Sequence, residues 1–215
     1  YLALGRYPQT RDESNCTSIE WLILKREKQR LLIISRNGLD AQPYNNIWND
    51  VTWEKSTLRT WLNSTFYSKA FTSSEQISIL TTTVNNGENN CYSKWNTNGG
   101  NSTRDKVFLL SCIEANNYFG VINNSDYIGA IKNNLKSRTA PTMYATGHGA
   151  YANPRDKTTD GVSAGWWWLR SPGNSQTNAA YVSTDGSLFY GDVTFASGLV
   201  RPAMWVDLES LIFQA

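Results

Sequence analysis

Two apolar runs separated by a charged link open the hydrophobic pattern of the chain. Residues 19–24 (Ile-Glu-Trp-Leu-Ile-Leu) and 31–35 (Leu-Leu-Ile-Ile-Ser) flank the charged segment 25–30. Short apolar runs joined by a polar link are typical of a β-hairpin, and continuous apolar stretches indicate a strand that is covered on both faces. The pattern therefore predicts an N-terminal hairpin with at least one strand buried on both faces.

A helical pattern follows the predicted hairpin. Leu58, Trp61, Leu62 and Phe66 lie near helical spacing on one face, with polar residues between them. An apolar stripe of this period predicts an amphipathic helix that packs this face against the core.

Two capping boxes mark further helices. Thr72 with Glu75 predicts a helix that begins near Ser73 and buries Ile77 and Leu80. Ser111 with Glu114, after the apolar segment 107–110, predicts a short helix to about Phe119, preceded by a buried strand. Segment 85–105 is rich in Asn and Gly and is expected to be a loop.

Strand patterns dominate the last quarter of the chain. Asp185-Gly186 is typical of a hairpin turn. The apolar segments that predict strands are 166–170, 179–183, 188–193 and 199–208. Helices in the first half and strands in the second indicate an α+β class. We expect two helices packed on one twisted antiparallel sheet, in which the first hairpin meets the last strand and brings the termini together.

The aromatic residues of the predicted core include three consecutive tryptophans. On a strand, Trp166 and Trp168 would fill the core and Trp167 would cover the other face. An aromatic platform for a sugar is the alternative interpretation. The residues expected to be buried are Trp21, Trp61, Leu62, Trp168 and Trp205.

Two arginines flank the polar C-terminal segment. Arg170 and Arg201 lie at predicted strand ends beside prolines. Guanidinium groups there can bind loop carbonyls and a carboxylate through several hydrogen bonds. We interpret both as structural residues that lie away from any open cavity, and we expect removal of Arg201 to lower the thermal stability.

Composition and charge narrow the possible partners. The 215 residues carry a formal net charge of +2 and are 40% hydrophobic, enough for one large domain (1–215) with a real core. The basic residues are dispersed apart from segment 25–30, so no nucleic-acid partner is expected. No apolar run approaches the ~18 residues of a membrane span, so no membrane insertion is expected. The N-terminus has no signal-peptide pattern, and we expect a mature or trimmed chain.

Few residues have the pattern of a catalytic or metal site. His148, the only histidine, is interpreted as a loop residue between two glycines, because no serine elbow accompanies it. Three widely spaced cysteines provide no metal motif; one disulfide and three free thiols are equally compatible with them. Trp48-Asn49-Asp50 is similar to a calcium-ligand tripeptide of lectins but lies in the wrong half of the chain. We therefore expect no catalytic residue, no metal and no cofactor, and nucleotide-binding motifs are absent.

Several segments resemble an uncharacterised domain family of gut bacteria. Its signature is Trp-Trp-Leu-Arg-Ser-Pro-Gly, found here at 167–173. The further matching segments are 5–9 (Gly-Arg-Tyr-Pro-Gln), 105–111 (Asp-Lys-Val-Phe-Leu-Leu-Ser), 180–182 (Ala-Tyr-Val) and 200–205 (Val-Arg-Pro-Ala-Met-Trp). In layout this family is similar to the C-type-lectin-like fold in its formylglycine-generating-enzyme branch. The ending Gly198-Leu199-Val200-Arg201 is one residue longer than the simplest form of the motif in that branch.

The resemblance implies a rigid sheet whose loops present a ligand surface. Some proteins with this fold are the variable proteins of diversity-generating retroelements, which diversify a C-terminal segment. We expect a non-catalytic domain that binds a protein or glycan, at a cell surface or on a phage. The ligand-binding residues expected from this resemblance are Asn174, Ser175, Gln176, Thr177, Phe189, Tyr190, Asp192, Thr194 and Ser197.

Two other functions compete with ligand binding. An enzyme of the formylglycine-generating or sulfoxide-synthase type would need paired C-terminal cysteines or a three-histidine iron site. This chain has no cysteine after Cys112 and one histidine. The other alternative is a purely structural module of a surface or phage protein. It differs from the ligand-binding domain only in that it has no ligand.

Overall fold

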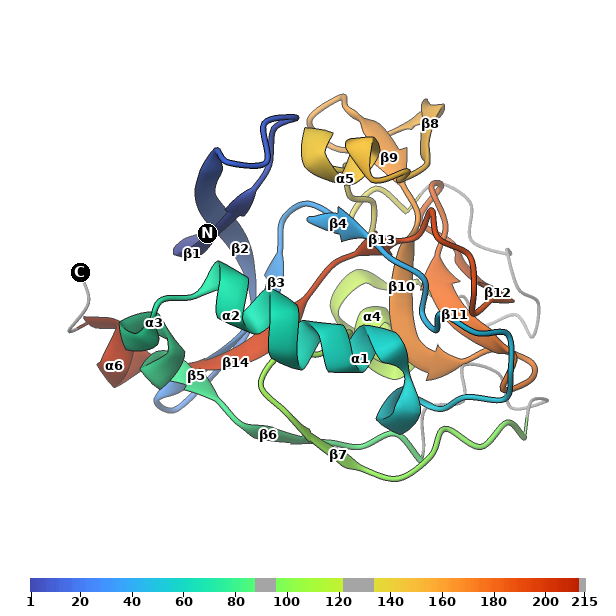
Figure 1. Cartoon of the computed structure of the whole chain (residues 1–215), viewed down its shortest axis with the longest axis horizontal. Coiled ribbons are helices and arrows are strands. Elements are labelled where there is room, and N and C mark those ends of the chain that lie inside the picture. Colours follow the sequence, from blue (N-terminus) through green and yellow to red (C-terminus); the bar gives the residue numbers. More distant parts are fainter. Residues whose placement is uncertain (88–95, 122–133, 213–215) are drawn as a thin grey trace.

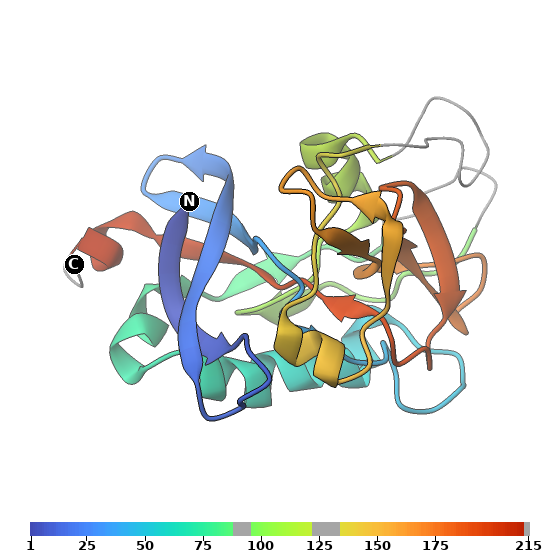
Figure 2. The same ribbon diagram turned by 90° about the horizontal axis from the view of Figure 1, so that it is seen from above.

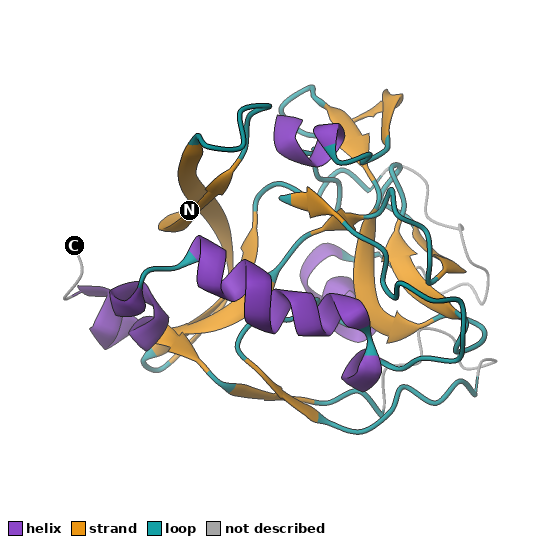
Figure 3. Cartoon of the chain, viewed as in Figure 1, coloured by secondary structure: helices purple, strands orange, loops and turns teal. Residues whose placement is uncertain are grey.

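The chain forms a mixed α+β structure that is mostly sheet with short helices (Figures 1 and 3). The computed structural model describes residues 1–87, 96–121 and 134–212. The α+β class expected from the sequence is confirmed, but the strands form two five-stranded sheets instead of one.

The first sheet has the order β1-β2-β3-β14-β5, and all its pairs are antiparallel. Its strands are β1 (Leu2–Pro8), β2 (Cys16–Glu27), β3 (Arg30–Ser35), β14 (Ala203–Asp207) and β5 (Ile79–Leu80). The predicted N-terminal hairpin is β2–β3, and all five β3 residues after Arg30 are buried: Leu31, Leu32, Ile33, Ile34 and Ser35. As expected, the last strand pairs with this hairpin, with Met204 opposite Ile33.

The second sheet has the order β12-β11-β10-β13-β4. Its strands are β12 (Leu188–Asp192), β11 (Asn178–Val182), β10 (Trp167–Pro172), β13 (Leu199–Val200) and β4 (Asp40–Ala41). β10 and β13 are parallel, and the other pairs are antiparallel. The predicted turn at Asp185-Gly186 joins β11 to β12, with Gly186 at φ 85°. Two smaller sheets pair β6 (Thr82–Val84) with β7 (Thr103–Asp105), and β8 (Ala152–Lys157) with β9 (Ser163–Gly165).

The predicted strand 199–208 is wrong as a single element. β13 belongs to the second sheet and β14 to the first, and Arg201 and Pro202 lie between them. Proline has no N–H for a ladder hydrogen bond and restricts the residue before it. The chain therefore leaves the second sheet at the end of β13 and enters the first at β14 (Figure 1), and Arg201 lies in the link between the two sheets.

The first predicted helix is a continuous helical run. It consists of α1 (Thr57–Trp61), a π-helical segment (Leu62–Phe66) and α2 (Tyr67–Ala70), after a 3-10 turn at Trp53–Lys55. Leu58, Leu62 and Phe66 are buried, as the periodicity predicts.

The helix after the first capping box is shorter than expected. Thr72 and Glu75 form the complete box, and α3 spans Ser73–Ser78. The predicted burial of Ile77 and Leu80 is wrong: Ile77 is 73% exposed, and Leu80 lies in β5, partly buried. Pairing of β5 with β14 ends the helix and buries Ile79 instead.

The second capping box is also confirmed, with Ser111 and Glu114 at the start of α4 (Cys112–Phe119) and Gly120 as a left-handed C-cap. Segment 107–110 is buried as expected, but it forms only an isolated bridge, Phe108 to Ala203. Two further short helices are α5 (Met143–Gly147) and α6 (Leu208–Ile212).

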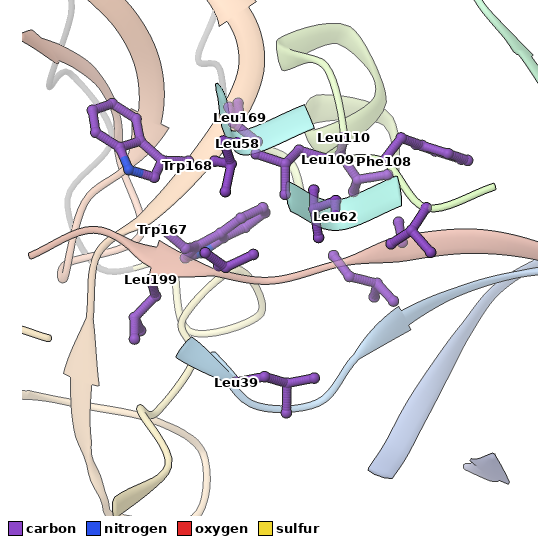
Figure 4. Packing of buried hydrophobic residues seen from close by; sticks show 14 of the residues in the cluster. Leu39, Leu58, Leu62, Phe108, Leu109, Leu110, Trp167, Trp168, Leu169 and Leu199 are labelled. Atoms are coloured by element: carbon purple, nitrogen blue, oxygen red, sulfur yellow. The ribbon is translucent and has the colours of Figure 1, made fainter. Parts of the chain in front are cut away.

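One cluster of buried apolar side chains extends across both sheets (Figure 4). Trp21, Leu62 and Trp168 lie in it fully buried, as expected. Trp61 and Trp205 are only partly buried, so full burial was a wrong expectation for both. Trp205 is the middle residue of β14, and the Arg30 guanidinium lies 4.3 Å from the centre of its ring.

The three consecutive tryptophans are all buried. Trp167 donates its indole N–H to Ser137 O (3.0 Å), and Trp168 donates to Gln42 O (3.0 Å). Trp166 is 9% exposed and packs edge-on against Trp168. Burial excludes these three residues as a sugar platform.

The first strand, β1, and the last helix, α6, lie on the same side of the molecule (Figures 1 and 2). Leu2 of β1 and Leu211 of α6 line one cavity. The expectation that the termini come together is confirmed.

Candidate functional site

The residues expected to bind a ligand surround the β11–β12 hairpin. Asn174 and Phe189 are exposed. The remaining seven, all partly buried, are Ser175, Gln176, Thr177, Tyr190, Asp192, Thr194 and Ser197. None lies in the core, so their side chains or edges remain accessible to a partner.

Hydrogen bonds join most of these residues into two groups. Asn174 donates to Tyr190 OH (3.1 Å), which connects the loop after β10 to β12. Thr194 donates its hydroxyl to Asp192 (2.6 Å), and the Val193 amide donates to Thr177 O (3.0 Å). These bonds bring together residues from the loop after β10 and from β12, and a single solvent-facing surface for the whole set stays a prediction.

Two members of the set behave differently from the rest. Gln176 donates to Asn98 O (3.0 Å), so part of its amide is already used within the molecule. Ser197 follows the hairpin, and its carbonyl accepts a hydrogen bond from the Tyr151 amide. Ser197 thus lies beside the segment after α5, apart from the Asn174–Tyr190 contact.

Phe189 and Tyr190 meet at the free edge of β12. The register pairs Phe189 with Tyr181 and Tyr190 with Ala180, which assigns the two side chains to opposite faces. Their rings are nevertheless nearly parallel, with centroids 5.8 Å apart. Strand alternation in the sequence predicts that these two side chains point to opposite sides, with at least one exposed. Phe189 is exposed as predicted, but the two rings lie side by side.

An aromatic surface covers the outer face of the hairpin. The Tyr181 ring lies 4.7 Å from Trp166 and 5.8 Å from Phe189. Phe195, 50% exposed, packs over Gly191, where an added Cβ would lie 3.0 Å from its ring. Phe189 is 42% exposed. The absence of a side chain at position 191 allows Phe195 to join this surface.

A loop from the first half of the chain borders the same hairpin. The Asn45 amide donates to Val193 O (2.8 Å), and the Val51 amide donates to Gln176 O (3.1 Å). Between these anchors, Ile47 is 68% exposed and Trp48 is 64% exposed. We call the surface of Ile47, Trp48, Asn174, Phe189, Tyr190 and Phe195 the hairpin face.

Sequence reasoning missed the role of the 45–51 loop. Trp48-Asn49-Asp50 was compared with a calcium motif, but Asn49 accepts a hydrogen bond from Asn45 within the loop. Within residues 1–87, 96–121 and 134–212, no cluster of three His, Cys, Asp or Glu side chains could hold a metal. The signal in the sequence that could have identified this loop is a tryptophan, Trp48, within a polar segment.

A second polar cluster surrounds His148. Asp40 is 2% exposed and accepts hydrogen bonds from Tyr7 OH and His148 Nδ1, both at 2.8 Å. The other ring nitrogen of His148 faces Glu13 at 3.5 Å. His148 is therefore more than a loop residue: it connects α5 to β4 through a buried carboxylate. The two ring nitrogens of His148 contact the carboxylates of Asp40 and Glu13. Neither nitrogen contacts a serine or cysteine nucleophile in the described residues.

The buried tyrosine of this cluster makes stability depend on alkaline pH. Burial, followed by the charge of Asp40, raises the pKa of the Tyr7 phenol. A folded-state pKa above the unfolded value near 10 contributes stability that is present below pH 10 and lost as the pH rises further. Between pH 10 and 11, Tyr7→Phe should therefore lose about 1 kcal/mol less unfolding free energy than the wild type. Urea unfolding at both pH values measures this difference, and equal losses would contradict it.

Arg170 and Arg201 make the hydrogen bonds expected of structural residues. Arg170 is 3% exposed and binds Glu114 with both terminal nitrogens, together with Leu109 O and Asn86 Oδ1. Arg201 is 1% exposed and donates to Ser35 O (2.9 Å). The expectation that both lie away from any cavity is wrong, since Arg170 lines a cavity of about 320 Å³ and Arg201 one of about 90 Å³.

The cysteines divide into two kinds. Cys112 at the start of α4 is disulfide-bonded, and Cys16 at the start of β2 is a free thiol. The sequence left two alternatives, one disulfide or three free thiols, and the second is wrong.

No helix in the described part of the chain is long and apolar enough to cross a membrane.

Comparison with known proteins places the chain in a family. Residues 28–208 match the model of a domain of unknown function, DUF6273. The match covers the second sheet, the hairpin face and strands β3, β5 and β14 of the first sheet, and the chain belongs to this family. No curated protein and no solved structure matches the chain.

Proposed function

We propose that this domain is a non-catalytic binding module that recognises a protein partner through the hairpin face. The observation that carries the proposal is the exposure of Trp48, Phe195 and Phe189 at 64, 50 and 42%. Large aromatic side chains are the residues that contribute most to protein interfaces, and several exposed apolar side chains around one hairpin favour an interaction site.

The anchoring of the hairpin face supports this function. Phe195 rests on Gly191, and the Trp48 loop is bound by backbone hydrogen bonds at Asn45 and Val51. Aromatic residues on loops that are already ordered give contact area at low entropic cost. The aliphatic Ile47 beside Trp48 favours a protein surface over a glycan.

We further propose the C-type-lectin-like fold of the formylglycine-generating-enzyme branch. Paired termini, an antiparallel framework and long loops at one end support it. Because the nine predicted ligand-binding positions are exposed or only partly buried, diversification of these positions by a retroelement is compatible with folding. An adjacent reverse transcriptase gene and a near-repeat of the 3′ end of the coding sequence would test that proposal.

The binding test uses the exposed aromatics directly. Peptides selected against the wild type from a phage-displayed library should bind a Trp48→Ala, Phe195→Ala double variant at least tenfold more weakly, because such rings carry about 2 kcal/mol or more at an interface. Surface plasmon resonance measures the affinities. The melting temperature should change by only a few degrees, since exposed side chains contribute little to stability.

Ile77→Ala is the matched control. Ile77 is 73% exposed on α3, at the opposite end of the molecule from β12 (Figure 1). This variant should bind every selected peptide as the wild type does. Peptides that bind the double variant with unchanged affinity would place the binding site elsewhere. A glycan array probed in parallel tests the other ligand class. If the protein binds glycans only when Trp48 is present, and no selected peptide depends on Trp48, the proposed protein partner is contradicted.

A further inference from the structure

Arg201 is a buried cation that contacts no charged partner among the residues that the structure describes. Its Nε donates to Ser35 O at 2.9 Å, but its terminal nitrogens reach only Ser137 O and Arg36 O, both at 3.5 Å. The Trp167 and Phe119 rings lie 5.0 and 5.2 Å from the guanidinium. In the described residues no carboxylate pairs with it. A guanidinium has five N–H donors, so most of its hydrogen-bonding capacity is poorly used.

Burial of the guanidinium costs more free energy at Arg201 than at Arg170. Arg170 is equally buried, but Glu114 neutralises it with two hydrogen bonds. Burial alone lowers the pKa of Arg201 to about 9, so the group still carries its charge at neutral pH. A buried charge is costly unless it is paired, and this one lacks an anion.

A small cavity lies directly beside Arg201. Its volume is about 90 Å³, and the residues that line it include Arg36, Lys136, Arg138, Thr158, Asp160 and Arg201. Four of these six side chains are cationic and one is anionic. Asp160 is already paired with Arg36 at 2.8 Å. The excess positive charge makes the cavity attractive to an anion.

Two further groups in the cavity lack a partner. The Thr158 hydroxyl oxygen is buried and makes no hydrogen bond. The exposed Lys136 ammonium forms no ion pair with any residue that the structure describes. A hydroxyl, an ammonium and a guanidinium around one small space are the donor types that bind phosphate and sulfate.

We infer that this cavity binds a small tetrahedral oxyanion, phosphate or sulfate, either free or as the terminal group of a larger ligand. The space corresponds to roughly three water molecules at ~30 Å³ each, which suits a single such group. The anion would pair with Arg201 from the cavity side and join segment 134–140 to the end of β3. This site is separate from the hairpin face, and its test is independent of the proposed partner binding.

Thermal unfolding with inorganic phosphate tests the inference. In a phosphate-free buffer, with chloride keeping the ionic strength constant, added phosphate should raise the melting temperature saturably. The rise should be about 5–10 °C at a hundredfold excess over Kd. Isothermal titration calorimetry should give one site per chain. Glycerol phosphate is titrated in parallel: similar affinity identifies a terminal phosphate group as the ligand, and binding of inorganic phosphate alone identifies the free ion.

Lysine variants distinguish the cavity from general charge effects. Lys136→Gln should weaken phosphate binding about tenfold, because it removes one charge-assisted contact. Lys55→Gln, an exposed lysine outside the cavity, should bind as the wild type does. Arg201→Met should show no rise in melting temperature with phosphate. If this variant does not fold, the comparison of Lys136→Gln with Lys55→Gln still tests the site. The inference is overturned if phosphate raises the melting temperature no more than chloride does. It is also overturned if the two lysine variants bind phosphate with equal affinity.

Discussion

Replacing Arg170 with methionine should lower the unfolding free energy by about 3–5 kcal/mol, because it removes one partner of a buried ion pair. The Glu114 carboxylate would lose both guanidinium hydrogen bonds, and Leu109 O would lose its 2.8 Å donor. Glu114 also caps α4, so the loss affects the helix and β10 together. The melting temperature measured by circular dichroism should fall by roughly 6–20 °C.

Arg155→Met is the matched control for this prediction. Arg155 is exposed in β8, and its replacement should change stability by no more than about 0.5 kcal/mol. Arg170→Lys should lie between the two variants, since lysine keeps the charge but cannot bind a carboxylate with a planar fork. A melting temperature for Arg170→Met equal to that of Arg155→Met would refute the structural role.

Gly198→Ala should be the next most destabilising change, at about 3 kcal/mol. An added Cβ would lie 2.3 Å from Trp168 Nε1 and 2.5 Å from Trp166 Cη2. Both indoles are buried, and Trp168 Nε1 is hydrogen-bonded to Gln42 O, so neither can move aside without cost. Overpacking of this kind typically costs 1–3 kcal/mol, and two close contacts place this site at the upper end.

A second glycine controls for the loss of backbone flexibility. Gly147 is the last residue of α5, and a Cβ there meets no atom within 4 Å. Gly147→Ala should therefore be neutral or stabilising by up to about 1 kcal/mol. Chemical denaturation of both variants measures the difference. Similar stabilities would mean that the tryptophans accommodate the methyl group.

Local patterns in the sequence predicted the elements whose stability depends on near neighbours. Both capping boxes form as expected, because each joins residues three positions apart. The β2–β3 hairpin and the Asp185-Gly186 turn follow for the same reason. The hydrogen-bonded roles of Arg170 and Arg201 were also predictable, since a guanidinium within an apolar segment must find acceptors.

The tertiary structure alone decided which surfaces stay exposed and which charges meet. Pairing of β5 with β14 buried Ile79 and exposed Ile77, and the 45–51 loop exposed Trp48 beside a hairpin more than a hundred residues away. The Asp40–His148 contact, and the separation of Arg201 from every carboxylate in the described part of the chain, depend likewise on how distant segments pack. Periodicity and spacing report only on neighbours along the chain, whereas burial and charge pairing are set by contacts between segments far apart in sequence. By itself the sequence determined the elements and their caps, and packing determined the division into two sheets, the hairpin face and the cationic cavity.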